Sequence, residues 1–182
     1  MPEPGDRGSG HPKARKRIAF RTVNCRTTPG FDPSLHRHHI LPLQVLRMPS
    51  FRPLFAALGP DRLCFDDFRA NGVLLPANDD AAIRHGLPLH RGPHRNYNAM
   101  VIERVGQIER TWASSISRYP DGALRDAYER LALLQRALRR RLLDQRKRIV
   151  LNRRDPLGAG IDFAELDAMA DVLWPATAPP ED

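Results

Sequence analysis

Cysteine is scarce in this chain of 182 residues, and long apolar runs are missing. Cys25 and Cys64 are the only cysteines and do not form a C-x-x-C pair. The sequence therefore excludes a cysteine zinc knuckle and a dithiol redox motif. One disulfide could form, although two reduced cysteines in a cytosolic protein are the simpler interpretation.

No apolar stretch approaches the roughly 18 residues that a membrane-spanning helix needs. Residues 1–17 are rich in proline, glycine and charge and contain no apolar segment, so they do not form a secretory signal. We therefore expect a cytoplasmic protein without membrane contacts. Another machinery, such as a secretion system, would have to deliver it into other cells.

Lysine is also rare and occurs only at positions 13, 16 and 147. Lysine and arginine together number 29, against 21 acidic residues. Arginine matches phosphate geometry with two parallel hydrogen bonds, so a net charge of +8 favours a nucleic-acid partner. A genome of high G+C content would replace lysine by arginine as well. We expect nucleic acid as the partner, DNA rather than RNA.

The apolar pattern predicts an α+β fold with few strands. Residues 36–42 form an extended segment closed by Pro42, and residues 73–76 form a short strand after an Asn71-Gly72 turn, which together give an irregular hairpin. Apolar residues at helical spacing predict a helix with Pro93 in its first turn. They are Tyr97, Val101, Val105, Ile108, Trp112 and Ile116.

Further helices are predicted on the same grounds. A second long helix runs from Asp121 to about Val150, and a helical turn covers residues 54–58. Asn78-Asp79-Asp80 is typical of a helix start and Gly86 of a helix end. A last short helix covers residues 163–173.

Two histidine clusters carry the chemistry of this sequence. His38 and His39 are adjacent at the end of an extended segment, where successive side chains point to opposite sides. His38 can then face a metal ion while His39, as a base, faces an attacking water. His90 and His94, at H-x-x-x-H spacing, would bring further nitrogens to the same ion. We expect both pairs to converge on it and to support phosphodiester cleavage.

One divalent ion is expected. Imidazole clusters bind Zn²⁺ or Ni²⁺ more tightly than Mg²⁺, although Mg²⁺ or Mn²⁺ could support turnover. For His90, a role in capping or orienting the neighbouring loop is the alternative to ligation.

Three blocks of sequence resemble one family. They are similar to the AHH subgroup of the HNH nuclease superfamily. In chain order the blocks are HHILP, NGVLLP and HRGPHRNYN-x-x-V. The resemblance covers residues 36–101. It implies a ββα-metal finger, here a small irregular hairpin plus helix embedded in a mostly helical domain. Arg37 stands where the alanine that gives the subgroup its name usually lies.

The resemblance also implies roles for single residues. His38, His90 and His94 would hold the metal and His39 would be the general base, with Asn71 holding the hairpin and the catalytic histidine. Asn71 could instead simply form the Asn-Gly turn. Tyr97, Asn98, Arg91 and Arg95 would support the site or bind substrate, although Tyr97 also fits a core position and Asn98 could brace the helix.

On this basis we expect a disordered basic arm at residues 1–20 and a ββα-metal nuclease core at 21–118. A helical extension at 119–174 and a flexible tail at 175–182 would follow. The resemblance implies a metal-dependent endonuclease with little sequence specificity. Many such domains are bacterial toxin effectors neutralised by acidic immunity proteins. The alternatives are a basic nucleic-acid-binding module with a structural metal and no catalysis, and a catalytically dead adaptor.

Overall fold

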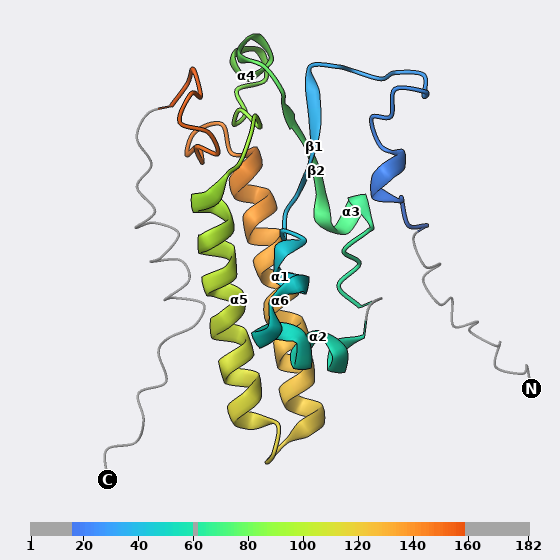
Figure 1. Ribbon diagram of the computed structural model, residues 1–182, viewed down its shortest axis with the longest axis vertical. Coiled ribbons are helices and arrows are strands. Elements are labelled where there is room, and N and C mark those ends of the chain that lie inside the picture. The colour runs from blue at the N-terminus through green and yellow to red at the C-terminus, as the bar shows by residue number, and fades with distance from the viewer. Residues whose placement is uncertain (1–15, 60–61, 159–182) are drawn as a thin grey trace, which may run out of the picture.

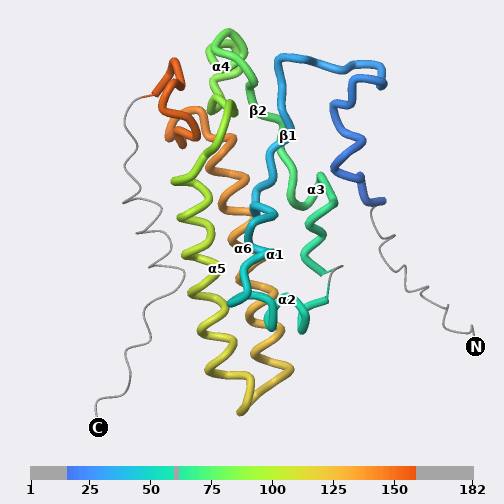
Figure 2. Tube along the Cα trace, in the orientation of Figure 1, coloured from blue at the N-terminus to red at the C-terminus, as the bar shows by residue number. Residues whose placement is uncertain are grey.

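Two long helices form the main body of the molecule. The computed structural model describes residues 16–59 and 62–158, so the helix predicted at 163–173 lies outside the described residues. Helices α5 (Arg95–Ser115) and α6 (Pro120–Leu143) run side by side in opposite directions (Figures 1 and 2). Their facing apolar stripes are buried and join the main core. These stripes include Tyr97, Val101, Val105 and Ile108 from α5, and Leu131, Leu134, Leu138 and Leu142 from α6.

Both predicted helix boundaries need correction. Helix α5 begins at Arg95 with His94 as its N-cap, so Pro93 lies before the first turn and not within it. Helix α6 ends at Leu143 and not near Val150. The carboxylate of Asp144 accepts hydrogen bonds from the backbone N–H groups of Arg146 and Lys147, at 2.8 and 3.1 Å, which stabilises a turn there.

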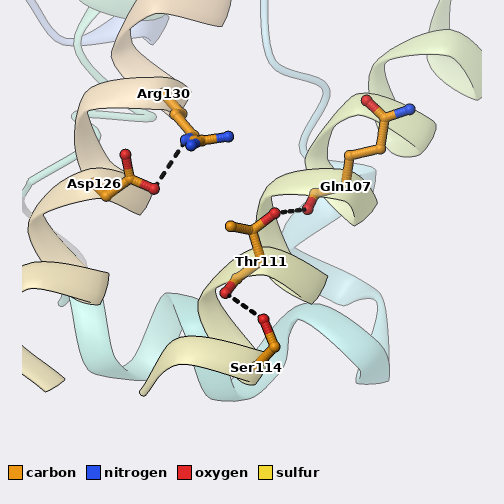
Figure 3. Close-up of polar contacts among 5 residues, drawn as sticks. All are labelled: Gln107, Thr111, Ser114, Asp126 and Arg130. Atoms are coloured by element: carbon orange, nitrogen blue, oxygen red, sulfur yellow. Dashed lines mark hydrogen bonds and ion pairs between the residues drawn. The ribbon is translucent and has the colours of Figure 1, made fainter. Parts of the chain in front are cut away.

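The polar contacts of five residues near the far end of the helix pair are local (Figure 3). The Thr111 hydroxyl donates to the Gln107 carbonyl at 3.0 Å, and the Ser114 hydroxyl donates to the Thr111 carbonyl at 2.9 Å. Asp126 and Arg130 form an ion pair of 2.8 Å within α6. Such a partly exposed pair contributes only about 0.5 kcal/mol. The apolar stripes therefore hold these helices together.

A two-stranded antiparallel sheet lies beside the helix pair (Figure 1). Strand β1 (Leu35–His39) pairs with β2 (Gly72–Pro76), with His38 opposite Val73. The expected α+β class with an irregular hairpin is thereby confirmed. Along the chain, the two strands are separated by four short helices, α1 (Gln44–Arg47), η2 (Pro49–Phe51), α2 (Arg52–Leu58) and α3 (Phe68–Asn71).

Two local features on either side of β2 can be compared with the sequence patterns. Asn71 ends α3 and Gly72 starts β2 in an extended conformation, so the predicted Asn-Gly turn is wrong. Helix α4 (Asp79–His85) has the predicted Asn78 cap, which accepts from the Ala81 N–H at 2.9 Å. Gly86 ends α4 with φ +64, a left-handed conformation that glycine adopts without strain.

The chain before β1 is joined to the core. The isolated bridge between Ala19 and Asp67 adds a short antiparallel contact, after which η1 (Phe20–Thr22) begins. The Phe20 N–H donates to the Asp66 carbonyl, and the Phe68 N–H to the Ile18 carbonyl, both at 2.8 Å. Residues 18–20, which we assigned to a disordered arm, are therefore paired with residues 66–68.

Asn71 connects the two strands to the helices. Its side chain is 0% exposed, and its Oδ1 accepts from the Leu41 N–H at 2.7 Å while Nδ2 donates to the Leu41 carbonyl at 3.1 Å. The Gln135 amide of α6 also donates to Oδ1, at 3.3 Å. The backbone carbonyl of Asn71 accepts from the Ile40 N–H at 2.8 Å. The segment that leaves β1 is thus fixed against the start of β2.

We expect Asn71→Ala to lower the free energy of unfolding by about 3 kcal/mol, because buried backbone groups at Leu41 lose their partners. Urea denaturation measures this change. The control is Asn96→Ala on the exposed side of α5, which should lie within about 0.5 kcal/mol of the wild type. Equal losses in the two variants would contradict the bridging role of Asn71.

Candidate active site

Three imidazoles meet where β1 passes the start of α5. One ring nitrogen from each of His38, His90 and His94 lies within 4.8 Å of the others. The ring centroids are 4.8 Å apart for His38 and His90, 4.9 Å for His38 and His94, and 5.0 Å for His90 and His94. The two histidines that follow α4 are therefore brought to the one on β1.

Each imidazole is positioned by a different local structure. His38 is 1% exposed and lies against the ring of Tyr97, whose hydroxyl donates to the Ile40 carbonyl at 2.6 Å. His90 donates its backbone N–H to the Pro76 carbonyl at 2.7 Å, which fixes its loop to the end of β2. His94 is the N-cap residue of α5.

The loop between His90 and His94 makes a sharp turn at Gly92. Gly92 has φ +79, a left-handed conformation that side chains with a Cβ rarely adopt. Its carbonyl lies 3.3 Å from Nδ1 of His94, where that nitrogen can donate. This contact favours the tautomer in which Nε2 of His94 carries the lone pair available to a metal.

A segment that sequence patterns missed also holds the His90 loop. Residues 144–158 pack back against it, and the Asp155 carboxylate accepts from the Leu89 N–H at 2.9 Å. Arg148 donates to the Gly86 carbonyl at 3.0 Å, and the Asn152 amide donates to the Arg91 carbonyl. The apolar periodicity of α6 led us to extend the helix into this segment, and no pattern in the sequence pointed to these contacts.

Burial keeps the cluster uncharged. Desolvation lowers the pKa of His38 to about 2, with further lowering from the neighbouring imidazoles. Burial, and then the nearby His94, lower the pKa of His90 to about 4. Burial also lowers the pKa of His94, against the opposing effect of the Gly92 carbonyl. At neutral pH all three rings are therefore neutral, the form that binds a metal ion.

The cluster fits a divalent metal ion. Within the described part of the chain, both ring nitrogens of His38, Nδ1 of His90 and Oδ1 of Asn98 are buried without hydrogen-bond partners. A neutral imidazole has one acceptor nitrogen, and a buried acceptor without a partner is destabilising. Coordination to a cation would satisfy one ring nitrogen each of His38 and His90. Three imidazole nitrogens suit borderline ions such as Zn²⁺ or Ni²⁺.

His39 lies on the other face of β1. Its ring stacks on Phe20 with a centroid separation of 3.5 Å and an interplanar angle of 8°. Burial lowers the pKa of His39, against the opposing effect of the Asp66 carboxylate. Three of the four imidazoles expected around one ion cluster together, and His39 lies outside this cluster. Its side chain points to the opposite side from that of His38, as expected for successive residues of a strand.

The other predicted residues surround the cluster without joining it. Asn98, one turn after His94, donates from Nδ2 to Gln44 of α1 at 3.4 Å. Arg91 and Arg95 are exposed on either side of His94. Asn71 makes the buried contacts described above, and its Nδ2 also donates to the Phe65 carbonyl at 3.4 Å. His36 is exposed, and its Nδ1 lies 3.3 Å from the His90 carbonyl.

Comparison with protein families agrees with this geometry. A model described as AHH, a nuclease family of the HNH/ENDO VII superfamily with conserved AHH, matches residues 21–132. The chain belongs to this family. The matched residues include both strands, all three clustered histidines and α5. Neither a curated protein nor a solved structure matches the chain.

Membership in a nuclease family implies a hydrolase that acts on nucleic acid, which confirms that part of the expected function. Among the described residues, none of the helices has the length and apolar character required to span a bilayer.

Calorimetric titration of the cation-free protein with Zn²⁺ or Ni²⁺ should show one ion per chain. We expect His94→Ala, and likewise His90→Ala, to weaken binding at least about tenfold, because each removes a ligand nitrogen. The control is His85→Ala at the exposed end of α4. Unchanged affinity in both cluster variants would rule out this cation site.

The stability of the cation-free protein should fall as the pH decreases below about 6.5, the ordinary pKa of histidine. Below this pH, His38 and His90 are protonated in the unfolded chain but stay neutral in the folded protein. The free energy of unfolding therefore decreases until the pH reaches the pKa in the folded protein, about 4 for His90. One such group contributes up to about 1.4 kcal/mol per pH unit.

Urea denaturation with a chelator, at several pH values from 7.5 to about 4.5, tests this dependence. In His38→Leu the free energy of unfolding should decrease less steeply with falling pH than in the wild type, because the variant lacks one histidine that is protonated only in the unfolded chain. Identical slopes for the two proteins would contradict the neutral, buried state of His38.

Proposed function

We propose that this chain is a metal-dependent endonuclease that hydrolyses phosphodiester bonds of DNA with little sequence specificity. The observation that carries the proposal is the cluster of three neutral imidazoles, His38, His90 and His94, one strand position from His39. Membership in the AHH nuclease family supports hydrolysis of nucleic acid. We propose DNA as the substrate on the basis of the net charge of +8 and of the family resemblance.

The number of ligands favours a catalytic site over a structural one. Within the described residues, the cluster offers three ligand side chains, whereas structural zinc sites are closed by four. A three-ligand site keeps a coordination position open for water or substrate. This distinguishes the proposal from a basic binding module with a purely structural metal.

A divalent ion held by these three side chains would supply positive charge to the scissile phosphate and the departing oxygen. His39 would act as the general base, accepting a proton from the attacking water at a ring nitrogen. Its lowered pKa keeps the ring neutral and able to accept a proton at neutral pH. The ring is only half-buried, so water can reach it.

The surroundings of the cluster suit a polyanionic strand. A cavity of about 600 Å³ adjoins it and is lined in part by His36, His90, Arg26, Arg37 and Phe31. Arg91 and Arg95 are exposed beside His94. Guanidinium groups bind phosphates, and an aromatic ring such as that of Phe31 can stack on a base. We assign Arg26, Phe31, Arg91 and Arg95 to substrate binding.

We further propose that the chain is a bacterial toxin effector, acting in the cytoplasm of a cell into which a secretion system delivers it. The family resemblance supports this context. The net charge of +8 would suit an acidic immunity protein as the neutralising partner.

Cleavage of plasmid DNA and of RNA should be measured with Mg²⁺, Mn²⁺, Zn²⁺ and Ni²⁺, each with and without chelator. We expect DNA cleavage that the chelator abolishes, and a loss of about 10²–10⁴-fold in His39→Ala, the usual contribution of a general base.

Two further measurements make this assay decisive. His39→Ala should keep the wild-type affinity for the cation, because His39 lies on the opposite face from the cluster, and His85→Ala should cleave like the wild type. DNA binding without cleavage under every cation would favour the binding module. Equal cleavage rates in His39→Ala and the wild type would remove His39 from its role.

A further inference from the structure

The His39 ring is oriented by an aromatic contact. Among the described residues, no hydrogen bond reaches the nitrogens of this ring. Its ring contact is the parallel stack on Phe20, at 3.5 Å between centroids. A histidine that acts as a base is usually oriented by a hydrogen bond to its other ring nitrogen, so here the stack is the feature that defines the plane of the ring.

Phe20 is itself held firmly. It is 8% exposed, and its backbone N–H donates to the Asp66 carbonyl at 2.8 Å. The ring of Phe68 packs against it at a centroid distance of 5.4 Å and an angle of 56°. The bridge between Ala19 and Asp67 fixes the preceding residue. Phe20 therefore offers His39 a fixed surface.

Arg37 secures the same segment from β1. It lies two residues before His39, on the same face of the strand, and its Nη1 donates to the Arg21 carbonyl at 2.6 Å and to the Phe20 carbonyl at 3.2 Å. The subgroup's motif usually has alanine at this position, which has no donor to make these bonds. Phe20 lies just before the first matched residue of the family model, residue 21.

We propose that Phe20 is a positioning residue for His39 and that Arg37 holds Phe20 in place. This inference rests on the proposed nuclease function. A general base must lie within hydrogen-bond reach of the water that it deprotonates, and a small misplacement lowers the rate strongly. The stack restricts rotation of the imidazole and thereby keeps its nitrogen directed at that water.

The test compares variants that remove the aromatic face with variants that keep it. Phe20→Ala removes the ring, Phe20→Leu keeps an apolar side chain without a flat face, and Phe20→Tyr keeps the stack. Arg37→Ala removes the two bonds to the segment. The matched control is Phe55→Ala, which removes a partly buried aromatic residue that packs against Phe51 and Phe65 and not against His39.

We expect Phe20→Ala and Phe20→Leu to lower kcat for DNA cleavage about tenfold, the scale set by an aromatic pair. The KM should stay within about twofold, because the substrate-binding residues are unchanged. Phe20→Tyr should restore kcat, and Arg37→Ala should lower it by a smaller factor. Cation affinity, measured by calorimetry, should be unchanged in all variants.

A second measurement is independent of activity. In the NMR spectrum of the cation-free protein, the ring protons of His39 should be shifted upfield by the Phe20 ring. This shift should disappear in Phe20→Ala and Phe20→Leu and return in Phe20→Tyr.

The results that overturn the inference are distinct from those that overturn the nuclease function. If the wild type cleaves DNA and Phe20→Leu has the same kcat, or if Phe55→Ala loses as much kcat as Phe20→Ala, the positioning role is wrong. Unshifted His39 ring protons in the wild type would also exclude it. A wild type that cleaves nothing under any cation would overturn the nuclease function, and the role of Phe20 with it.

Discussion

The pairing of β1 with β2 determines the chemistry of this site, because it decides which way each histidine of the adjacent pair faces. With His38 opposite Val73, the His38 ring points towards the start of α5 and His39 points away from it. A shift of one residue in this register would exchange the two faces. The imidazole buried against Tyr97 would then be His39, and His38 would face Phe20. The register is therefore a functional constraint as well as a structural one.

Two strands of five residues are too little structure to hold such a register alone. Additional support comes from buried polar side chains at the end of β1, where Asn71 binds Leu41 and the Tyr97 hydroxyl binds the Ile40 carbonyl. Gln135 connects this network to α6. The long helices thus serve the site indirectly, since they provide the buried surface against which the strand end is fixed.

Segments outside the family-matched residues complete the arrangement. Phe20 covers one side of His39, and Asp155 binds the backbone of Leu89 just before His90. The family model ends at residue 132, before this second segment. The matched residues therefore contain the histidines, while some of the contacts that fix their geometry come from residues outside the matched range.

Elements with a local pattern could be predicted from the sequence, whereas most contacts between distant segments could not. The helical spacing from Tyr97 to Trp112 and the cap at Asn78 are local patterns, and both predicted elements form. The proximity of His38, His90 and His94 followed from two compact clusters together with a resemblance. Sequence patterns did not predict the stack of Phe20 on His39 or the contacts of residues 144–158, because irregular segments have no periodicity. The Asn71-Gly72 turn failed because a local turn preference was overridden by burial of the Asn71 side chain among long-range partners.

The opposite orientations of His38 and His39 separate two requirements that would conflict at a single position. A metal ligand is best buried and neutral, and within the described residues His38 meets this requirement with both ring nitrogens lacking partners. This state is destabilising, so binding of a cation to His38 would be coupled to folding. A general base, the role that we propose for His39, must instead remain accessible to water, and His39 is half-buried on the other face. Because the His39 ring stacks on Phe20 and not on the cluster, the orientation of the base that we propose would not depend on whether a cation is bound.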